Sequence, residues 1–303
     1  ANGTKKFVEA VDAVNIALGD DLNNNADEVA NTVGKLANTY GDVTKSIDEN
    51  ITKTGSLLNE ISKLPVTTGK FIADFALATS AAANTYKTSI GDFAGIGSVL
   101  EQAGFESKTA GNNVSKLFGQ LTANVAKYSK VLQLSGQEQK QFATLLNTDT
   151  NEALLFFLEK LDLLNKSPIE IDATLKKLGL NDTEIIGITK TLGVNIDKVR
   201  ASQEFANKAF SDGTSITNER AKALASLDSV LSRISNTLAN VFASPEVING
   251  LTSIANAILT VINFAIGLIG VLAQLPKFIK ENKVSISLLT IGLAAFNASI
   301  IIA

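Results

Sequence analysis

A run of 29 residues, 247–275, contains no charged side chain and constrains the fold of this chain more than any other feature. As a helix that rises about 1.5 Å per residue, the run would be about 43 Å long, which exceeds a hydrocarbon core of about 30 Å. Pro276 ends it, a short basic turn follows at 277–283, and a second uncharged run occupies 284–303. The second run is also about long enough to span a membrane. Residues 246–303 are therefore predicted to form a hydrophobic helical hairpin, truncated at its end.

The first arm of this hairpin carries a stripe of amide and small residues, in two series that each repeat every seven residues. The stripe consists of Asn249, Ser253, Asn256, Thr260, Asn263, Gly267, Gly270 and Gln274. Neutral polar groups in lipid cost free energy unless they find partners or water. The stripe therefore favours close helix–helix contact in a membrane or an oligomer, or a face towards a water-filled lumen. The alternative is a core helix of a soluble bundle whose stripe touches solvent.

Helix start and stop signals recur along the rest of the chain. The clearest start is Ser167-Pro168, where serine caps, proline occupies the first helical position and Glu170 follows at the third. Other expected starts pair a capping residue with an acid three positions later: Asn25 with Glu28, Ser135 with Glu138, Asp149 with Glu152, and Asn181 with Glu184. Glycine stops are expected at Gly41, Gly179 and Gly193. Alternating runs long enough for a strand are absent, so we predict an all-α fold.

Four regions differ in helix length and composition. Residues 1–90 are low in aromatic residues and are expected to form four moderately long helices. Residues 91–212 are expected to form shorter helices with glycine stops, which suits a compact helical core domain. A heptad helix at 214–244 and the hairpin at 246–303 follow. The predicted architecture is a multi-helix bundle followed by a coiled-coil-like helix and a hydrophobic helical hairpin.

The heptad helix at 214–244 has apolar residues spaced alternately three and four positions apart. These residues are Leu224, Leu227, Leu231, Ile234, Leu238 and Val241. Such spacing is typical of a coiled-coil seam, in which two core positions recur in every heptad. An amphipathic helix packed on the bundle shows the same stripe over a short stretch. Both an oligomeric coiled coil and intramolecular packing therefore stay open.

Residue types missing from the chain exclude several kinds of chemistry. The sequence has no Cys and no His, which excludes disulfides, thiolate nucleophiles, zinc peptidases and serine–histidine triads. Charged residues make up only 19%, and the net charge is −3. Phosphate binding needs a concentrated basic face, so we expect no specific nucleic-acid binding.

The remaining candidate motifs have structural explanations. Gly95-Ile96-Gly97-Ser98 lacks the third glycine of a phosphate loop, and we expect a helix-breaking turn there. Asp149 and Glu152 are explained as a helix cap and its first-turn partner. Glu159 and Asp162 are explained as the solvated face of an amphipathic helix. We therefore predict that the chain is not an enzyme and has no catalytic, cofactor or metal site.

The region from about residue 93 to 212 has a characteristic order of short capped helices and small loops. It runs through 97–105, Ala110-Gly111, 112–114, Leu117-Phe118, 134–138, 142–146, Asp149 and 152–158, and continues at 175–192 and 200–215. This order resembles the conserved core of the tail tape measure proteins of long-tailed bacteriophages. In that family an alanine–glycine pair opens the second helix of a helix–glycine–helix segment. The resemblance covers about half the chain well and residues 1–90 more loosely.

The resemblance implies a structural role. Such proteins occupy the tail tube lumen of the virion, set tail length as a template for the tube subunits during tail assembly, and leave ahead of the DNA. Parts of them are thought to help genome ejection across the host cell envelope, which the hairpin at 246–303 fits independently. The implied partners are further copies of the chain, tail tube and tail-tip proteins, and the host membrane during infection. Because the chain begins with Ala1 and stops within an apolar run, we expect it to belong to a longer polypeptide that contains most of the ruler.

Two other classes of protein fit the composition. A pore-forming α-helical toxin would shelter the hydrophobic hairpin in a helical bundle until insertion. It would act as a discrete secreted polypeptide, whereas a tape measure segment would lie within a much longer chain. A membrane-anchored helical scaffold would need continuous membrane residence, and solubility without detergent would argue against it.

Overall fold

The computed structural model describes residues 2–19, 21–22 and 26–242, apart from the side chains of residues 2–4, 164 and 237–242. Within these residues the secondary structure is entirely helical, with no strand, so the prediction of an all-α fold is confirmed. The chain divides into two units, Ala1–Ala225 (unit 1) and Ser226–Ala303 (unit 2). The predicted hairpin at 246–303 lies outside the described residues.

Unit 1 begins with five helices where the sequence predicted four. They are α1 (Asn2–Leu18), α2 (Ala26–Tyr40), α3 (Ile47–Ile61), α4 (Gly69–Ala78) and α5 (Ser80–Tyr86). The extra break lies at Thr79, between α4 and α5. The Thr79 hydroxyl donates to the carbonyl oxygens of Phe75 (3.2 Å) and Ala76 (3.1 Å). A threonine that bonds back to its own helix in this way competes with the regular backbone pattern and bends the chain.

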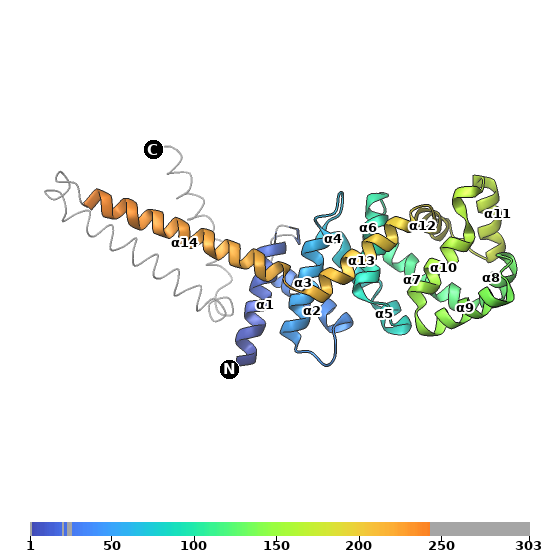
Figure 1. The fold of residues 1–303 in the computed structure, drawn as a ribbon, viewed down its shortest axis with the longest axis horizontal. Helices are drawn as coiled ribbons and strands as arrows, with labels where there is room; N and C mark the ends of the chain where they lie inside the picture. Colours follow the sequence, from blue (N-terminus) through green and yellow to red (C-terminus); the bar gives the residue numbers. More distant parts are fainter. Residues whose placement is uncertain (1, 20, 23–25, 243–303) are drawn as a thin grey trace. The chain divides into compact units, whose positions relative to one another are not determined.

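The rest of unit 1 consists of helices of similar length, of 7 to 17 residues, with one 3₁₀ turn at Leu163–Asn165, so the expected change to shorter helices after residue 90 is not seen. They are α6 (Ile90–Gln102), α7 (Ser107–Ala123), α8 (Val125–Val131), α9 (Gly136–Thr148), α10 (Thr150–Leu161), α11 (Pro168–Leu178), α12 (Thr183–Val194) and α13 (Ile196–Asp212). Helix α14 (Ser215–Phe242) begins in unit 1 and ends in unit 2. Figure 1 shows α1–α4 at one end of unit 1 and α8–α11 at the other, with α6 and α13 between them.

Several predicted helix ends are confirmed. Capping boxes begin α9 at Ser135 and α11 at Ser167, and Pro168 occupies the first turn of α11. Asp149 caps α10 by accepting from the Glu152 amide at 2.9 Å. Gly179 ends α11 with φ +88°, in the left-handed region that favours glycine.

Two predicted helix ends are wrong. The N-cap of α12 is Asp182 rather than Asn181, because the Asp182 carboxylate accepts from the amides of both Glu184 and Ile185. Gly193 does not end a helix but lies inside α12, where a Cβ atom would come within 2.5 Å of the Leu163 side chain. Glycine at this position, next to the last residue of α12, lets the Leu163 side chain pack closely against the helix.

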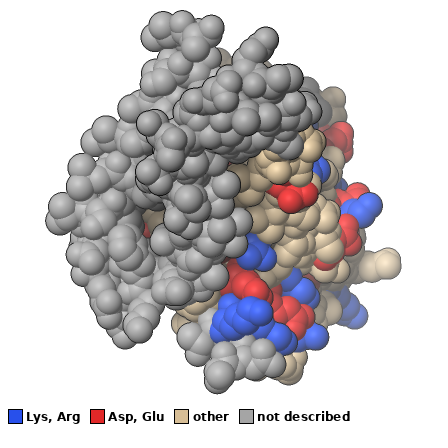
Figure 2. All heavy atoms as spheres, turned by 90° about the vertical axis from the view of Figure 1, so that its left-hand side faces the viewer, with Lys and Arg blue, Asp and Glu red and all other residues tan. Residues whose placement is uncertain are grey.

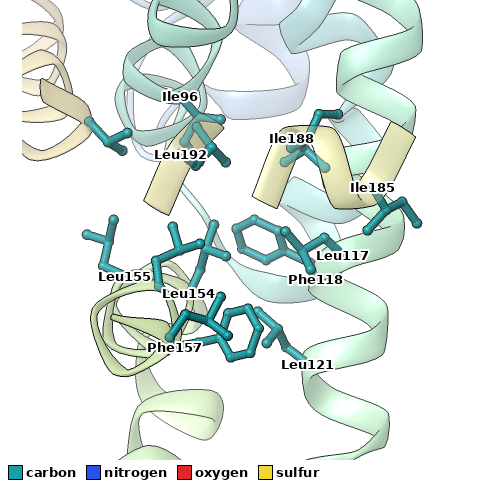
Figure 3. Packing of buried hydrophobic residues seen from close by; sticks show 14 of the residues in the cluster. Ile96, Leu117, Phe118, Leu121, Leu154, Leu155, Phe157, Ile185, Ile188 and Leu192 are labelled. Atoms are coloured by element: carbon teal, nitrogen blue, oxygen red, sulfur yellow. The ribbon is translucent and has the colours of Figure 1, made fainter. Parts of the chain in front are cut away.

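Two hydrophobic clusters form the interior of unit 1. The first joins α1, α2 and α3 with parts of α4, α6, α13 and α14. The second spans α4 to α13, and Figure 3 shows its centre, where Phe118 lies among Leu117, Ile188 and Phe157. Phe118 is fully buried, and its ring lies 5.5 Å from that of Phe93. These clusters supply most of the apolar burial that stabilises the unit.

Helix α13 crosses α6 at a distance that only glycine permits. A Cβ atom at Gly95 would lie 2.5 Å from the backbone nitrogen of Gln203, and one at Gly91 would lie 2.8 Å from that of Asn207. The expectation of a helix-breaking turn at Gly95-Ile96-Gly97-Ser98 is therefore wrong, since these residues lie inside α6. The helix tolerates its glycines because burial against α13 outweighs their low helix propensity, roughly 1 kcal/mol each.

Candidate interaction surface

The heptad seam lies on α14, a single helix of 28 residues. Leu224, Leu227 and Ile234 are exposed to 50%, 42% and 39%, and Val230 beside the seam to 47%. Leu231 is half-buried, while the side chains of Leu238 and Val241 lie outside the described part of the chain. Large apolar side chains at this exposure, repeated at heptad spacing, are typical of a helix surface that binds a partner.

The first turns of α14 are anchored on α1 and α3 within unit 1. Ile216 is fully buried in a space that Gly55 leaves open: a Cβ atom at Gly55 would lie 3.0 Å from Cδ1 of Ile216 and 2.7 Å from Val14. Arg220 Nε donates to the Asp12 carboxylate of α1 at 2.9 Å. The first turns of α14 are therefore held by the buried side chain of Ile216 and by the ion pair of Arg220 with Asp12, and we call these contacts the anchor.

A serine hydrogen-bond network completes this anchor. The Ser215 hydroxyl accepts from Asn59 Nδ2 at 2.5 Å and donates to the Glu60 carboxylate. The Ile216 amide donates to the Ser56 hydroxyl at 3.4 Å. An open hollow beside the network is lined by Phe205 among other residues. Three polar side chains of α3 thus bind the first two residues of α14, which supplies the partners that buried polar groups require.

A second polar network, between α6, α10 and α13, was not predicted from the sequence. Gln203 Nε2 donates to Asn151 Oδ1 at 2.8 Å and to the Asp92 carbonyl oxygen at 3.2 Å, while Asn151 Nδ2 donates back to Gln203 Oε1 at 3.3 Å. Gln203 and Asn151 are both about 5% exposed. A satisfied buried amide pair specifies one arrangement of the helices that carry it. In the sequence, the only sign of this network was one polar residue, Asn151 or Gln203, on the buried face of α10 and of α13.

The carboxylates considered for catalysis have structural roles. Arg200 on α13 donates to Glu152 at 3.1 Å and to Glu159 at 2.7 Å, so both acids of α10 are tied to α13. Asp162 accepts from Asn165 Nδ2 at 2.7 Å in the following turn. These three acids are thus engaged in ion pairs and turn hydrogen bonds, which is how surface carboxylates of a helical core are commonly used.

Glu106 shows the same use of an acid at the start of a helix. It caps α7, and the Thr109 amide, from which its carboxylate accepts at 2.7 Å, is the main cause of a pKa of about 2 for this carboxyl. Such a low pKa marks an acid that binds amides, not one poised to transfer protons near neutral pH.

Glu138 links the cap of α9 to α10. Its carboxylate pairs with Lys160 of α10 and also accepts from the Ser135 amide at 2.8 Å. The Lys160 hydrogen bond, followed by those from Ser135, lowers the pKa of Glu138 from 4.5 to about 2. The carboxyl therefore stays ionised in the folded protein well below the pH at which it would protonate in the unfolded chain.

We expect Glu138→Gln to change the acid sensitivity of unit 1. A lowered folded-state pKa stabilises the fold above the unfolded pKa, and this contribution disappears as pH falls from about 5 to about 2. The urea midpoint of the variant should therefore lie below that of the parent at pH 7, and the two should converge near pH 2. Glu204→Gln, at an exposed position on α13, is the matched control for the loss of one carboxylate, and its urea midpoint at pH 7 should match that of the parent. Parallel curves for Glu138→Gln and its parent would refute the role of the pair.

The surface of the described residues carries mixed charges. On the face shown in Figure 2, basic and acidic side chains lie next to one another in the lower part of the visible described surface, and uncharged residues cover much of the remainder. Among residues 2–19, 21–22 and 26–242 no group of three or more acids has the arrangement of a metal site. No helix in this part of the chain is long and apolar enough to cross a membrane.

The polar stripe predicted on the hairpin, from Asn249 to Gln274, lies outside the described residues, so its geometry stays a prediction. Among the described residues, the candidate interaction surface is therefore the heptad seam of α14, whose first turn is fixed by its contacts with α1 and α3. Comparison with known proteins adds no family to these observations: no family model, no curated protein and no solved structure matches the chain.

Proposed function

We propose that this chain is a non-enzymatic segment of the tail tape measure protein of a long-tailed bacteriophage. In this role it occupies the lumen of the tail tube, takes part in setting tail length during assembly, and leaves the virion at infection. Its partners are further copies of itself, tail tube and tail-tip proteins, and the host membrane. The hydrophobic hairpin at 246–303 then assists passage of the genome across the host cell envelope.

The observation that carries the proposal is the resemblance at 93–212, whose key residues have packing roles in unit 1. Gly111, in the first turns of α7, lies so close to α4 that a Cβ atom there would come within 2.9 Å of the Phe75 carbonyl oxygen. Its neighbour Ala110 is fully buried. Glu101 holds the start of α4, where its carboxylate accepts from the Thr68 amide at 3.0 Å. These are roles expected of a structural core rather than of a catalytic site.

The first test is the intact mass of the native polypeptide that contains this sequence, measured together with its presence in phage particles. The proposal expects a chain much longer than 303 residues that co-purifies with virions. A free polypeptide near 31.9 kDa that is absent from particles would contradict it. That second result would instead favour a pore-forming α-helical toxin that shelters the hairpin until insertion.

The polar stripe gives a second, functional test. Replacing both Asn256 and Asn263 by leucine is expected to leave tails of normal length but to lower infectivity roughly tenfold, because the amides are needed only when the hairpin meets a membrane or its own copies. Tail length is measured by electron microscopy and genome delivery by plaque counts per particle. Ile258→Leu, which keeps the apolar surface outside the stripe, is the control. Unchanged infectivity of the double variant would remove the stripe from the mechanism.

A further inference from the structure

The heptad register of α14 continues in phase into α13. Counting back from Leu224 and Leu227 in steps of seven places α13 residues at both core positions. One series is Ile196, Gln203, Phe210, Thr217, Leu224, Leu231 and Leu238, and the other is Val199, Ala206, Gly213, Arg220, Leu227, Ile234 and Val241. Ten of these fourteen residues are apolar. The apolar core positions on the two helices, at 196–210 and at 224–241, therefore share one heptad phase, although Gly213, Thr217 and Arg220 between them are not apolar.

A connector of only two residues, Gly213 and Thr214, interrupts this pattern. Helix α13 ends at Asp212 and α14 begins at Ser215. Gly213 has φ +60° and ψ +22°, the left-handed conformation that ends a helix, and its amide donates to the Ala209 carbonyl oxygen at 3.1 Å. A continuous helix therefore requires a helical backbone at these two residues.

The conformation of the connector is held by contacts that the first residues of α14 make with α1 and α3. Ile216 fills the space beside Gly55, Ser215 bonds to Asn59 and Glu60, and Arg220 pairs with Asp12. Beyond these contacts, Leu224 is already half exposed. These contacts with α1 and α3 keep the first turn of α14 separate from α13. They therefore oppose the formation of the continuous helix that the heptad register favours.

We propose that the α13–α14 connector is a convertible joint. When Ser215, Ile216 and Arg220 leave the anchor, residues 213–214 become helical and α13 and α14 join into one heptad helix at 196–242. At about 1.5 Å per residue this helix is about 70 Å long. Helix α13 keeps its glycine-lined contact with α6, so only the anchor has to break. The inference goes beyond the tape measure role and does not depend on it.

The joint predicts which amides gain hydrogen bonds. In the structure the amides of Thr214, Ser215 and Thr217 donate to no backbone carbonyl, although all three are described. In a continuous helix each donates to the residue four positions earlier, at 210, 211 and 213. Hydrogen exchange at these three amides therefore separates the two conformations, because hydrogen-bonded amides exchange more slowly.

The test variant is Gly213→Ala combined with Ile216→Ala in the 303-residue chain. Alanine disfavours the left-handed turn and favours helix, which alone shifts the equilibrium roughly tenfold. Ile216→Ala removes the apolar plug of the anchor. We expect exchange at residues 214, 215 and 217 to slow roughly tenfold or more while the amides of α6 and α10 keep their protection. Fast exchange at all three positions, with α6 and α10 still protected, overturns the proposal.

Two further variants keep the test decisive. Gly104→Ala is the control for alanine at a positive φ (+83°), because nothing lies within 4 Å of an added Cβ atom there, whereas a Cβ atom at Gly213 would lie 2.9 Å from Lys53 Cγ. It should leave residues 214–217 unchanged, and slowing in this variant also contradicts the joint. If Ile216→Ala unfolds unit 1, Gly213→Ala with Arg220→Ala replaces it, since both positions are only half-buried. The same slowing is expected there, and its absence is equally decisive.

Discussion

Replacing Gly95 by alanine is expected to lower the free energy of unfolding of unit 1 by about 3 kcal/mol, at the upper end of the usual cost of overpacking. The added methyl would lie 2.5 Å from the backbone nitrogen and 2.6 Å from Cα of Gln203. Backbone atoms cannot rotate away as a flexible side chain can, so α6 and α13 would have to separate. Separation would also weaken the amide pair of Gln203 and Asn151. Urea titration followed by far-UV circular dichroism measures the change.

Gly34→Ala is the matched control for this prediction. Gly34 lies inside α2, and an added Cβ atom there meets nothing within 4 Å. Because alanine has the higher helix propensity, this variant should be more stable than the parent by about 0.5–1 kcal/mol. The same substitution thus has opposite signs at the two sites. A stabilising effect of Gly95→Ala would show that the crossing of α6 and α13 is not close.

Phe118→Ala is expected to cost about 4 kcal/mol, the usual range for a fully buried phenylalanine being about 3–5 kcal/mol. The Phe118 side chain is fully buried, and its ring lies 5.7 Å from that of Tyr86 and 5.5 Å from that of Phe93. Figure 3 shows it between α7 and the residues of α12, so its loss opens a cavity at the centre of the second cluster. The same urea titration reports the loss.

The control for this cavity is Ile169→Ala, because Ile169 is also a large apolar residue in a helix but is 81% exposed. It is expected to change the free energy of unfolding by no more than about 0.5 kcal/mol. A small loss for Phe118→Ala, within the range of Ile169→Ala, would mean that the second cluster is loosely packed. The difference between the two variants therefore measures how much the burial of an apolar side chain in the second cluster contributes to the free energy of unfolding.

The parts of the fold that the sequence predicted correctly depend on neighbouring residues. Ser135 with Glu138, and Ser167 with Pro168 and Glu170, begin helices through bonds that span three positions, so their signal is complete within a short window. The misplaced start at Asn181 shows the limit of this rule. Asp182 was one residue away, and both side chains can cap, so spacing alone did not separate them.

The parts that the sequence did not predict depend on distant residues. Gly95 has low helix propensity, and its close contact with the backbone of Gln203 explains why it lies inside a helix. The seam of α14 has the same limit, because heptad spacing predicts an apolar face without naming its partner. The structure places Leu224 and Leu227 on an exposed helix face, and the anchor at Ile216 had no signal beyond a single apolar residue.

The contacts of α13 and α14 with α3 and α6 join residues that are far apart in the sequence. Gln203 bonds to a residue 111 positions earlier, and Ser215 to one 156 positions earlier. During synthesis α3 and α6 therefore leave the ribosome long before α13, and the face of α6 that carries Gly91 and Gly95 stays uncovered until α13 follows. Contacts of such large sequence separation form slowly, because a long loop must close first. We therefore expect the docking of α13 and α14 to be a late step in the folding of unit 1.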